Sequence, residues 1–461
     1  MLMRRIVPIK FDRLYLSALF TLALPIIIQN GISSSLNAID VMMLGQMGEI
    51  PVAAVGLANQ VFFLLSFMLF GISSGAGIFS AQYWGKNDLP GIRRVLGMAL
   101  MMTCGAALFF MIAALVIPRT VLSIYTADAA VIATGTEYLR IVGWSYLLTA
   151  ISFSFSATLR ATGNVRLPMV ASVTAIILKT SLSYVLIFGK FGLPAMGVAG
   201  AALATLLARG VECVLLLALT YRLKTPAAAR LAEMLDIRKE FLAGFLKLAL
   251  PVAVNETLWS LGISVYNLVY ARIGTESIAA INIAGTIEGL AFVFFIGISD
   301  ATSILIGNKI GAGQDEAAYS YGQRSLTLAT LAALVVGGLI LALRGPVLSL
   351  YAVSPQALED ASRILLVMGL ALWVRISNMI LVVGVLRSGG DTRFGLIIDT
   401  GTVWGVGVPL ALLGAFVLHL PVYWVYLMVM SEEVVKYIFL LIRFFSRRWI
   451  HDVTLVGQSP A

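Results

Sequence analysis

The stretch "LALPIIIQN" at residues 22–30 recurs as "LALPVAVNE" at residues 248–256, and this repetition decides the fold. The spacing of 226 residues then persists without a gap along both halves of the chain. The further matches are "VAAVGLAN" (52–59) with "IAAINIAG" (278–285), "FGIS" (70–73) with "IGIS" (296–299), "VLSIYT" (121–126) with "VLSLYA" (347–352) and, at a spacing of 227, "TLRATGNVR" (158–166) with "VLRSGGDTR" (385–393). A shared register that includes Gly, Pro and Arg positions indicates two halves of common architecture.

The composition places both halves in a membrane. Hydrophobic residues make up 60% of the chain and charged residues only 12%, and the mean hydropathy is +0.96. Soluble domains typically carry about 25% charged residues. Apolar runs of roughly 20 residues recur along the chain, which is long enough to cross a bilayer core of roughly 30 Å. Because the runs are continuous and do not alternate, they favour helices over a β-barrel.

We therefore predict an all-α integral membrane protein with twelve transmembrane helices in two six-helix pseudo-symmetric bundles. An even number of spans in each repeat makes the two bundles parallel. The predicted domains are an N-lobe at 1–221, a cytoplasmic linker at 222–240 and a C-lobe with a cytoplasmic tail at 241–461. The expected spans lie near 14–44, 51–83, 92–117, 130–160, 167–188, 195–221, 241–272, 277–309, 319–343, 357–387, 394–415 and 421–445.

The net charge of +9 reflects membrane orientation and does not indicate nucleic-acid binding. Most Lys and Arg fall in the two tails and in the loops on one side, which the positive-inside rule makes the cytoplasmic side. We therefore expect a multi-pass protein of the cell (inner) membrane with both termini in the cytoplasm. The basic segment 222–247 is expected to form a short surface helix in a solvated linker that touches anionic headgroups. Cys104 and Cys213 lie in predicted spans and suggest neither a disulfide framework nor a metal site.

Several paired motifs resemble those of one transporter family. They are the two LALP starts, "GISSGAGIFSAQYWGKND" (71–88) with "GISDATSILIGNKIGAGQ" (297–314), and "LRATGN" (159–164) with "LRSGGD" (386–391). Together these motifs resemble the multidrug and toxic compound extrusion (MATE) family over about residues 14–445. The resemblance implies twelve helices in two lobes, and export of cationic or amphipathic organic compounds in exchange for sodium or protons.

On this basis we expect a secondary active antiporter that works by alternating access, driven by an H⁺ or Na⁺ gradient. Its expected partners are small organic cations and membrane lipids, and we expect a monomer without a cofactor. The sequence contains no Walker A motif that would indicate nucleotide use. A lipid-linked oligosaccharide flippase of the same superfamily is the alternative, although its cavity should be more uniformly basic. A membrane-embedded enzyme is a remote alternative, because the sequence has two His and two Cys and no spacing typical of metal ligands.

Asp40 lies inside the first span, where an ionised carboxylate is costly and is a functional candidate by default. The resemblance implies a role in ion coupling, since family members carry an Asp at the corresponding first-helix position. Lys179 stands where the family pattern has Asn, and Ser183 where it has Asp. We expect an Asp40–Lys179 pair, either a static contact or a switch that opens when the acid takes a proton. Pro25 predicts a helix hinge nearby, because proline removes a backbone donor, and Pro251 is its counterpart in the second half.

Glu256 and Glu288 are expected near mid-depth in spans 7 and 8. Two carboxylates at one depth attract a cation or share a proton, so both are candidates for ion coupling, with Na⁺ as one possible ligand. Arg375 lies near the same depth and could neutralise one of them, while no carboxylate stands where the family has its helix-10 acid. Further members expected in this substrate and charge network are Asn255, Asn282, Tyr266 and Tyr270.

Other charges in the spans have ordinary structural explanations. Arg160 and Arg387 lie at the inner ends of spans 4 and 10, where we expect them to bind headgroups or cap helices. Asp399 is expected to cap a helix or to pair with a loop Arg. Lys436 is expected to pair within its own helix with Glu432 or Glu433, because the spacing of three or four residues favours such contacts.

Overall fold

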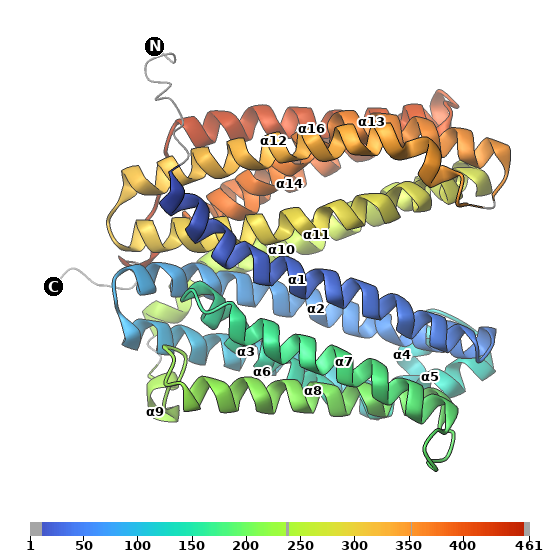
Figure 1. Ribbon diagram of the computed structural model, residues 1–461, viewed down its shortest axis with the longest axis horizontal. Coiled ribbons are helices and arrows are strands. Elements are labelled where there is room, and N and C mark those ends of the chain that lie inside the picture. The colour runs from blue at the N-terminus through green and yellow to red at the C-terminus, as the bar shows by residue number, and fades with distance from the viewer. Residues whose placement is uncertain (1–11, 237–238, 352, 456–461) are drawn as a thin grey trace. The chain divides into compact units, whose positions relative to one another are not determined.

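The computed structural model describes residues 12–236, 239–351 and 353–455, and all regular structure in these ranges is helical (Figure 1). The helices of the first half are α1 (Arg13–Gly45), α2 (Glu49–Gly85), α3 (Leu89–Val116), α4 (Pro118–Ser123), α5 (Ala129–Val142), α6 (Ser145–Ala161), α7 (Arg166–Phe188) and α8 (Gly197–Arg222), followed by α9 (Leu231–Met234) in the linker. The second half contains α10 (Lys239–Ile273), α11 (Thr275–Gly311), α12 (Asp315–Leu348), α13 (Pro355–Met379), η1 (Ile380–Leu386), α14 (Thr392–Thr402), η2 (Val403–Gly407), α15 (Val408–Leu412), η3 (Leu413–Val417), α16 (Val422–Phe445) and η4 (Val453–Leu455).

Each of the twelve predicted spans has a helical counterpart among the described residues. Ten helical segments are long and apolar enough to cross a membrane. The fourth predicted span is the pair α5 and α6, which is bent by 49°. The twelfth is α16, a helix of 24 residues that carries four charged side chains, Glu432, Glu433, Lys436 and Arg443. The predicted all-α membrane fold is therefore confirmed.

Contacts divide the chain into two compact units whose boundaries lie inside α1 and α10. We call residues 12–27 and 254–455 the C-unit, and residues 28–253 the N-unit. Both helices continue through a proline, Pro25 in α1 and Pro251 in α10. Each boundary falls two residues after that proline. The two sequence repeats therefore share one arrangement, in which a proline-containing helix begins in one unit and ends in the other.

Small residues let α10 approach α2 closely within the N-unit. A Cβ atom added at Gly71 would lie 2.6 Å from the Cα of Ala253, and one added at Gly75 would lie 2.9 Å from the Cα of Ala249. Real Cβ atoms do not approach backbone atoms so closely, so both positions require glycine. The first part of α10 is thus held against α2 by the glycines of the "GISSGAG" motif.

The linker before α10 is docked and partly buried, which corrects the expectation of a solvated segment. Ala227, Ala229 and Met234 are buried and join an apolar cluster with residues of α3, α6, α7 and α8. The backbone of Met234 lies so close to Gly97 of α3 that a larger residue at position 97 would collide with it. Burial of these apolar groups stabilises the contact between the linker and the N-unit helices.

Ion pairs fix the same linker to α3. The guanidinium of Arg93 lies 2.6 Å from the carboxylate of Glu233, and that of Arg94 lies 2.7 Å from Asp236. The backbone N–H of Arg230 donates a hydrogen bond of 2.6 Å to Glu233. This hydrogen bond, followed by the contact with Arg93, lowers the pKa of Glu233 below its ordinary value of 4.5. The carboxylate of Glu233 therefore stays ionised at neutral pH and keeps its contact with Arg93.

The C-unit packs α11, α13 and α16 around a core of aliphatic and tyrosine side chains. Three π-helical segments interrupt the ordinary helices there. Two of them flank polar residues, since η1 lies directly before Arg387 and η2 directly after Thr402. Wide turns of this kind occur often at functional sites because they re-aim neighbouring side chains. They mark the region of the C-unit in which polar side chains gather.

Candidate functional site

The N-unit contains the ion pair that the sequence predicted. The ammonium of Lys179 on α7 lies 2.6 Å from Oδ2 of Asp40 on α1, and the two side chains are 27% and 14% exposed. The other carboxylate oxygen of Asp40 is buried and has no hydrogen-bond partner among the described residues. One oxygen is therefore compensated by a cation, while the second is an acceptor that a proton could satisfy.

Arg160 and Arg387, both from the repeated "LR" motifs, contact the part of α1 or α10 that follows its proline. Arg160 donates a hydrogen bond of 3.2 Å to Gln29 in the N-unit. Arg387 lies 2.5 Å from the carboxylate of Glu256 in the C-unit. Arg387 is only 4% exposed, so its expected role in headgroup binding or helix capping is wrong. Its charge instead neutralises the partly buried carboxylate of Glu256.

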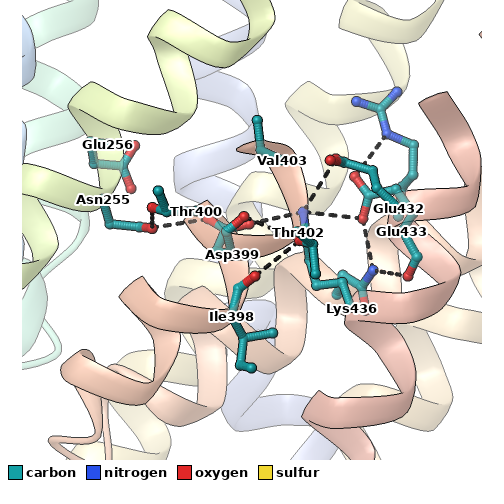
Figure 2. A network of polar contacts seen from close by, with 12 residues as sticks. Asn255, Glu256, Ile398, Asp399, Thr400, Thr402, Val403, Glu432, Glu433 and Lys436 are labelled. Atoms are coloured by element: carbon teal, nitrogen blue, oxygen red, sulfur yellow. Dashed lines mark hydrogen bonds and ion pairs between the residues drawn. The ribbon is translucent and has the colours of Figure 1, made fainter. Parts of the chain in front are cut away.

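The centre of the C-unit site is the ammonium of Lys436 on α16. It lies 2.9 Å from Asp399, 3.5 Å from Glu433 and 3.6 Å from Glu432 (Figure 2). Lys436 is 2% exposed, and a buried cation of this kind requires such partners. The expected contacts within α16 are therefore present, but the shortest contact runs to Asp399 on α14. The expectation that Asp399 caps a helix is therefore wrong, because its carboxylate contacts Lys436.

Neutral hydrogen-bond donors complete the site around these charges. Asn255 on α10 donates a bond of 3.0 Å to Asp399 and accepts one of 3.2 Å from Thr400. The hydroxyl of Tyr266 donates a bond of 2.8 Å to Glu432. The amide of Asn378 on α13 donates a bond of 2.7 Å to the carboxylate of Glu433. The predicted Asn255 and Tyr266 thus belong to the site, and Asn378 adds a third neutral donor.

Arg375 links this centre to α11. It forms an ion pair with Glu288, and its Nε lies 3.7 Å from Glu433. The guanidinium also lies over the ring of Phe292, 5.3 Å from its centroid. The predicted neutralisation by Arg375 is therefore present, and it acts on Glu288. Glu256 has a different cation, Arg387.

The remaining predicted residues of the C-unit play smaller parts. Asn282 is exposed on α11. The expectation that it joins the buried network is therefore wrong. Tyr270 is buried and packs against Tyr426, with ring centroids 6.4 Å apart. Within the described ranges no group of three or more His, Cys, Asp or Glu side chains is arranged to hold a metal ion.

The residues that the sequence analysis undervalued are Lys436, Asp399, Glu432 and Glu433. The sequence did mark this region, because Glu432, Glu433 and Lys436 place three charges within five residues of one apolar span, which is unusual and costly. The local spacing offered a complete explanation within α16, and this concealed the contact with α14. What the arrangement can do chemically follows from its mixture of charges: it can bind a cation, release a proton, or exchange one for the other.

The comparisons with known proteins agree with this architecture. The MatE family model matches residues 25–185 and 251–413, one match in each repeat. The uncharacterized transporter YisQ of Bacillus subtilis is 28% identical over 437 residues, which cover 94% of this chain and 95% of that protein. The probable multidrug resistance protein NorM of Thermotoga maritima is 25% identical over 449 residues, covering 95% of this chain and 94% of that protein.

Solved structures match the fold over nearly the whole chain. An outward-facing multidrug resistance MATE family transporter of the MOP superfamily superposes with a TM-score of 0.84 at 21% identity, covering 94% of this chain and 96% of that one. A MOP superfamily transporter from Pyrococcus furiosus gives a TM-score of 0.83 at 21% identity, with 96% of both chains covered. Because the family matches span both repeats and the fold agrees throughout, the resemblance is confirmed, and the chain belongs to the MatE family of membrane transporters.

Proposed function

We propose that this chain is a multidrug efflux transporter, a secondary active antiporter that exports amphipathic or cationic organic compounds by alternating access in exchange for protons. Its similarity to relatives named as multidrug resistance proteins supports the substrate class. The observation that carries the proposal is the pair of ionisable centres inside the helical spans, one in each unit: Asp40 with Lys179, and the carboxylates around Lys436. Such groups inside a membrane protein belong to ion or substrate pathways far more often than to the scaffold.

Protons are the coupling ion that the arrangement favours over sodium. The ammonium groups of Lys179 and Lys436 already contact carboxylate oxygens that a sodium ion would need as ligands. A proton needs one carboxylate oxygen, whereas a metal ion needs several oxygen ligands at once. We therefore assign coupling to H⁺ and make Na⁺ the competing outcome of the test.

Within this proposal, Asp40 and Lys179 form a switch. The pair is closed while Asp40 is ionised, and it opens when a proton neutralises the carboxylate and removes the attraction. Glu256, Glu288, Arg375, Asn255 and Tyr266 are assigned to the charge network that recognises the organic cation. The mixture of acids and bases in this network suits an organic cation better than a pyrophosphate lipid.

Pro25 and Pro251 are assigned as hinges in the two helices that the units share. A proline inside a helix lacks one hydrogen bond and weakens that turn, which makes bending there less costly. We further propose a monomer in the cell (inner) membrane with both termini in the cytoplasm, surrounded by membrane lipids. The two six-helix lobes of the sequence, joined by the linker at 222–240, are proposed as the parts that move during transport.

Transport in proteoliposomes under separately imposed gradients tests the proposal. The probe is tetraphenylphosphonium, a lipophilic monovalent cation, and each liposome batch carries either a pH gradient or a sodium gradient. We expect the pH gradient alone to drive uphill movement of the probe, and Asp40→Asn to abolish it. Movement driven by the sodium gradient alone would replace the assigned ion, and movement driven by neither would refute antiport of organic cations.

A further inference from the structure

The buried centre of the C-unit carries more acid than base. We call Asp399, Glu432, Glu433, Glu288, Arg375 and Lys436 the Lys436 cluster. Its members are joined by the ion pairs that Lys436 makes with the first three acids and that Arg375 makes with Glu433 and Glu288. Four carboxylates thus share two cations, because Glu256 has its own partner in Arg387. Such an excess of buried negative charge is costly unless a proton or a bound cation offsets it.

Glu432 is the least compensated acid of the cluster. Its closest donor is the neutral hydroxyl of Tyr266 at 2.8 Å, and its contact with Lys436, at 3.6 Å, is the longest of the three that this lysine makes. Asp399 has the shortest contact with Lys436 and an additional hydrogen bond from Asn255. At 3% exposure, Glu432 also has little access to water. Protonating Glu432 therefore removes less electrostatic attraction from the cluster than protonating any of the other three acids would.

The other three acids are held more firmly in the ionised form. Glu433 receives the amide of Asn378 at 2.7 Å and lies within 4 Å of both Lys436 and Arg375. Glu288 forms an ion pair with Arg375. The charged and titratable groups around Glu432 come from α10, α11, α13, α14 and α16: they are Tyr266, Tyr270, Glu288, Arg375, Asp399, Glu433 and Lys436.

A second observation points to an added hydrogen-bond donor in the same place. The side-chain oxygen of Asn378 is buried and has no hydrogen-bond partner among the described residues. Asn378 is 3% exposed, and its amide nitrogen is the one that contacts Glu433. A buried acceptor without a donor is destabilising. The unsatisfied oxygen beside the excess carboxylates therefore favours an added hydrogen-bond donor in the cluster, such as a protonated carboxyl group.

We propose that Glu432 is a second proton-binding site, located in the C-unit, and that Tyr266 positions its carboxylate. The inference rests on the proposed proton-driven export and adds a site to Asp40. The step is a simple dissociation, in which the carboxylic acid of Glu432 becomes a carboxylate and the proton leaves for water. Loss of the proton raises the acid excess of the cluster by one charge, and a monovalent organic cation offsets that same charge. Proton release and substrate binding are therefore linked at this cluster.

Proton release on substrate binding tests the assignment without requiring transport. The purified protein in weakly buffered detergent receives tetraphenylphosphonium, and a pH-sensitive dye counts the protons released for each cation bound. We expect Glu432→Gln to bind the probe but to release one proton fewer than the wild type. Glu359→Gln is the matched control, because Glu359 forms an exposed pair with Arg363 one turn away on α13, and it should release as many protons as the wild type.

Unchanged proton release from Glu432→Gln, with the wild type releasing protons, would refute the role of Glu432 and leave the proposed function intact. A wild type that binds the probe without releasing protons would refute the proton coupling itself. Tyr266→Phe gives a second readout should Glu432→Gln fold poorly, since it keeps the carboxylate and removes its hydrogen bond. We expect its proton release to shift to higher pH, and an unchanged pH profile would count against the assignment.

Discussion

Replacing Lys436 with Met is the most informative test of the C-unit site. The substitution keeps much of the side-chain volume and removes the cation that contacts Asp399, Glu432 and Glu433. Breaking a buried ion pair on one side typically costs about 3–5 kcal/mol, because an unpaired buried charge remains. All three acids keep another hydrogen bond, from Asn255, Tyr266 or Asn378, so the loss should lie at the lower end, about 3 kcal/mol.

The change should be visible as a lower midpoint of thermal unfolding. For a unit of 150–250 residues, 1 kcal/mol corresponds to about 2–4 °C, so Lys436→Met should lower Tm by about 6–12 °C. Intrinsic tryptophan fluorescence in detergent reports on the C-unit, which contains Trp259, Trp373, Trp404, Trp424 and Trp449.

A matched control and a compensating variant make the test specific. Lys309→Met removes an ammonium that forms an exposed hydrogen bond with Gln314, and its effect should stay within about 0.5 kcal/mol. Adding Asp399→Asn to Lys436→Met restores the original charge excess and should recover at least about 1 kcal/mol, as expected for directly coupled residues. If Lys436→Met lowers Tm no more than the Lys309 control does, the ammonium does not hold the buried carboxylates together.

Three further predictions concern the N-unit. Gly75→Val should destabilise it by about 1–3 kcal/mol, because the new side chain collides with α10, whereas Gly77→Val, which has open space around it, should have little effect in the same thermal assay. Lys179→Asn should extend transport activity to higher pH, since no ammonium then competes with the proton for the Asp40 carboxylate; an unchanged pH profile of tetraphenylphosphonium transport would show a static pair. Because a linker backbone N–H and Arg93 lower the pKa of Glu233, their stabilising effect is complete above about pH 4.5 and is lost as the pH falls through the lowered value. Hydrogen exchange should therefore show the linker loosening in acid, and Arg93→Ala should loosen it at neutral pH; equal protection in both proteins would contradict the docking contact.

Depth in the membrane and the need for a partner could be read from the sequence. The apolar runs located the spans because the length of a bilayer-crossing helix is fixed by the thickness of the hydrocarbon core. The pair of Asp40 and Lys179 could be predicted because each charge was costly alone and both lay in the same half of the membrane. The repeated motifs located the prolines of α1 and α10 and the two arginines that reach back to those helices.

The choice of partner among several buried charges was decided only by the tertiary structure. Glu256 and Glu288 were expected to share one site, yet they contact different arginines. Lys436 was expected to be satisfied within α16, yet its shortest contact is with Asp399 on α14. Sequence position fixes how deep a residue lies along its helix, whereas the direction in which its side chain points depends on how neighbouring helices are rotated and packed. The sequence by itself therefore determined that this chain is a twelve-span transporter with buried charges, and the packing of α10, α14 and α16 decided which of those charges meet.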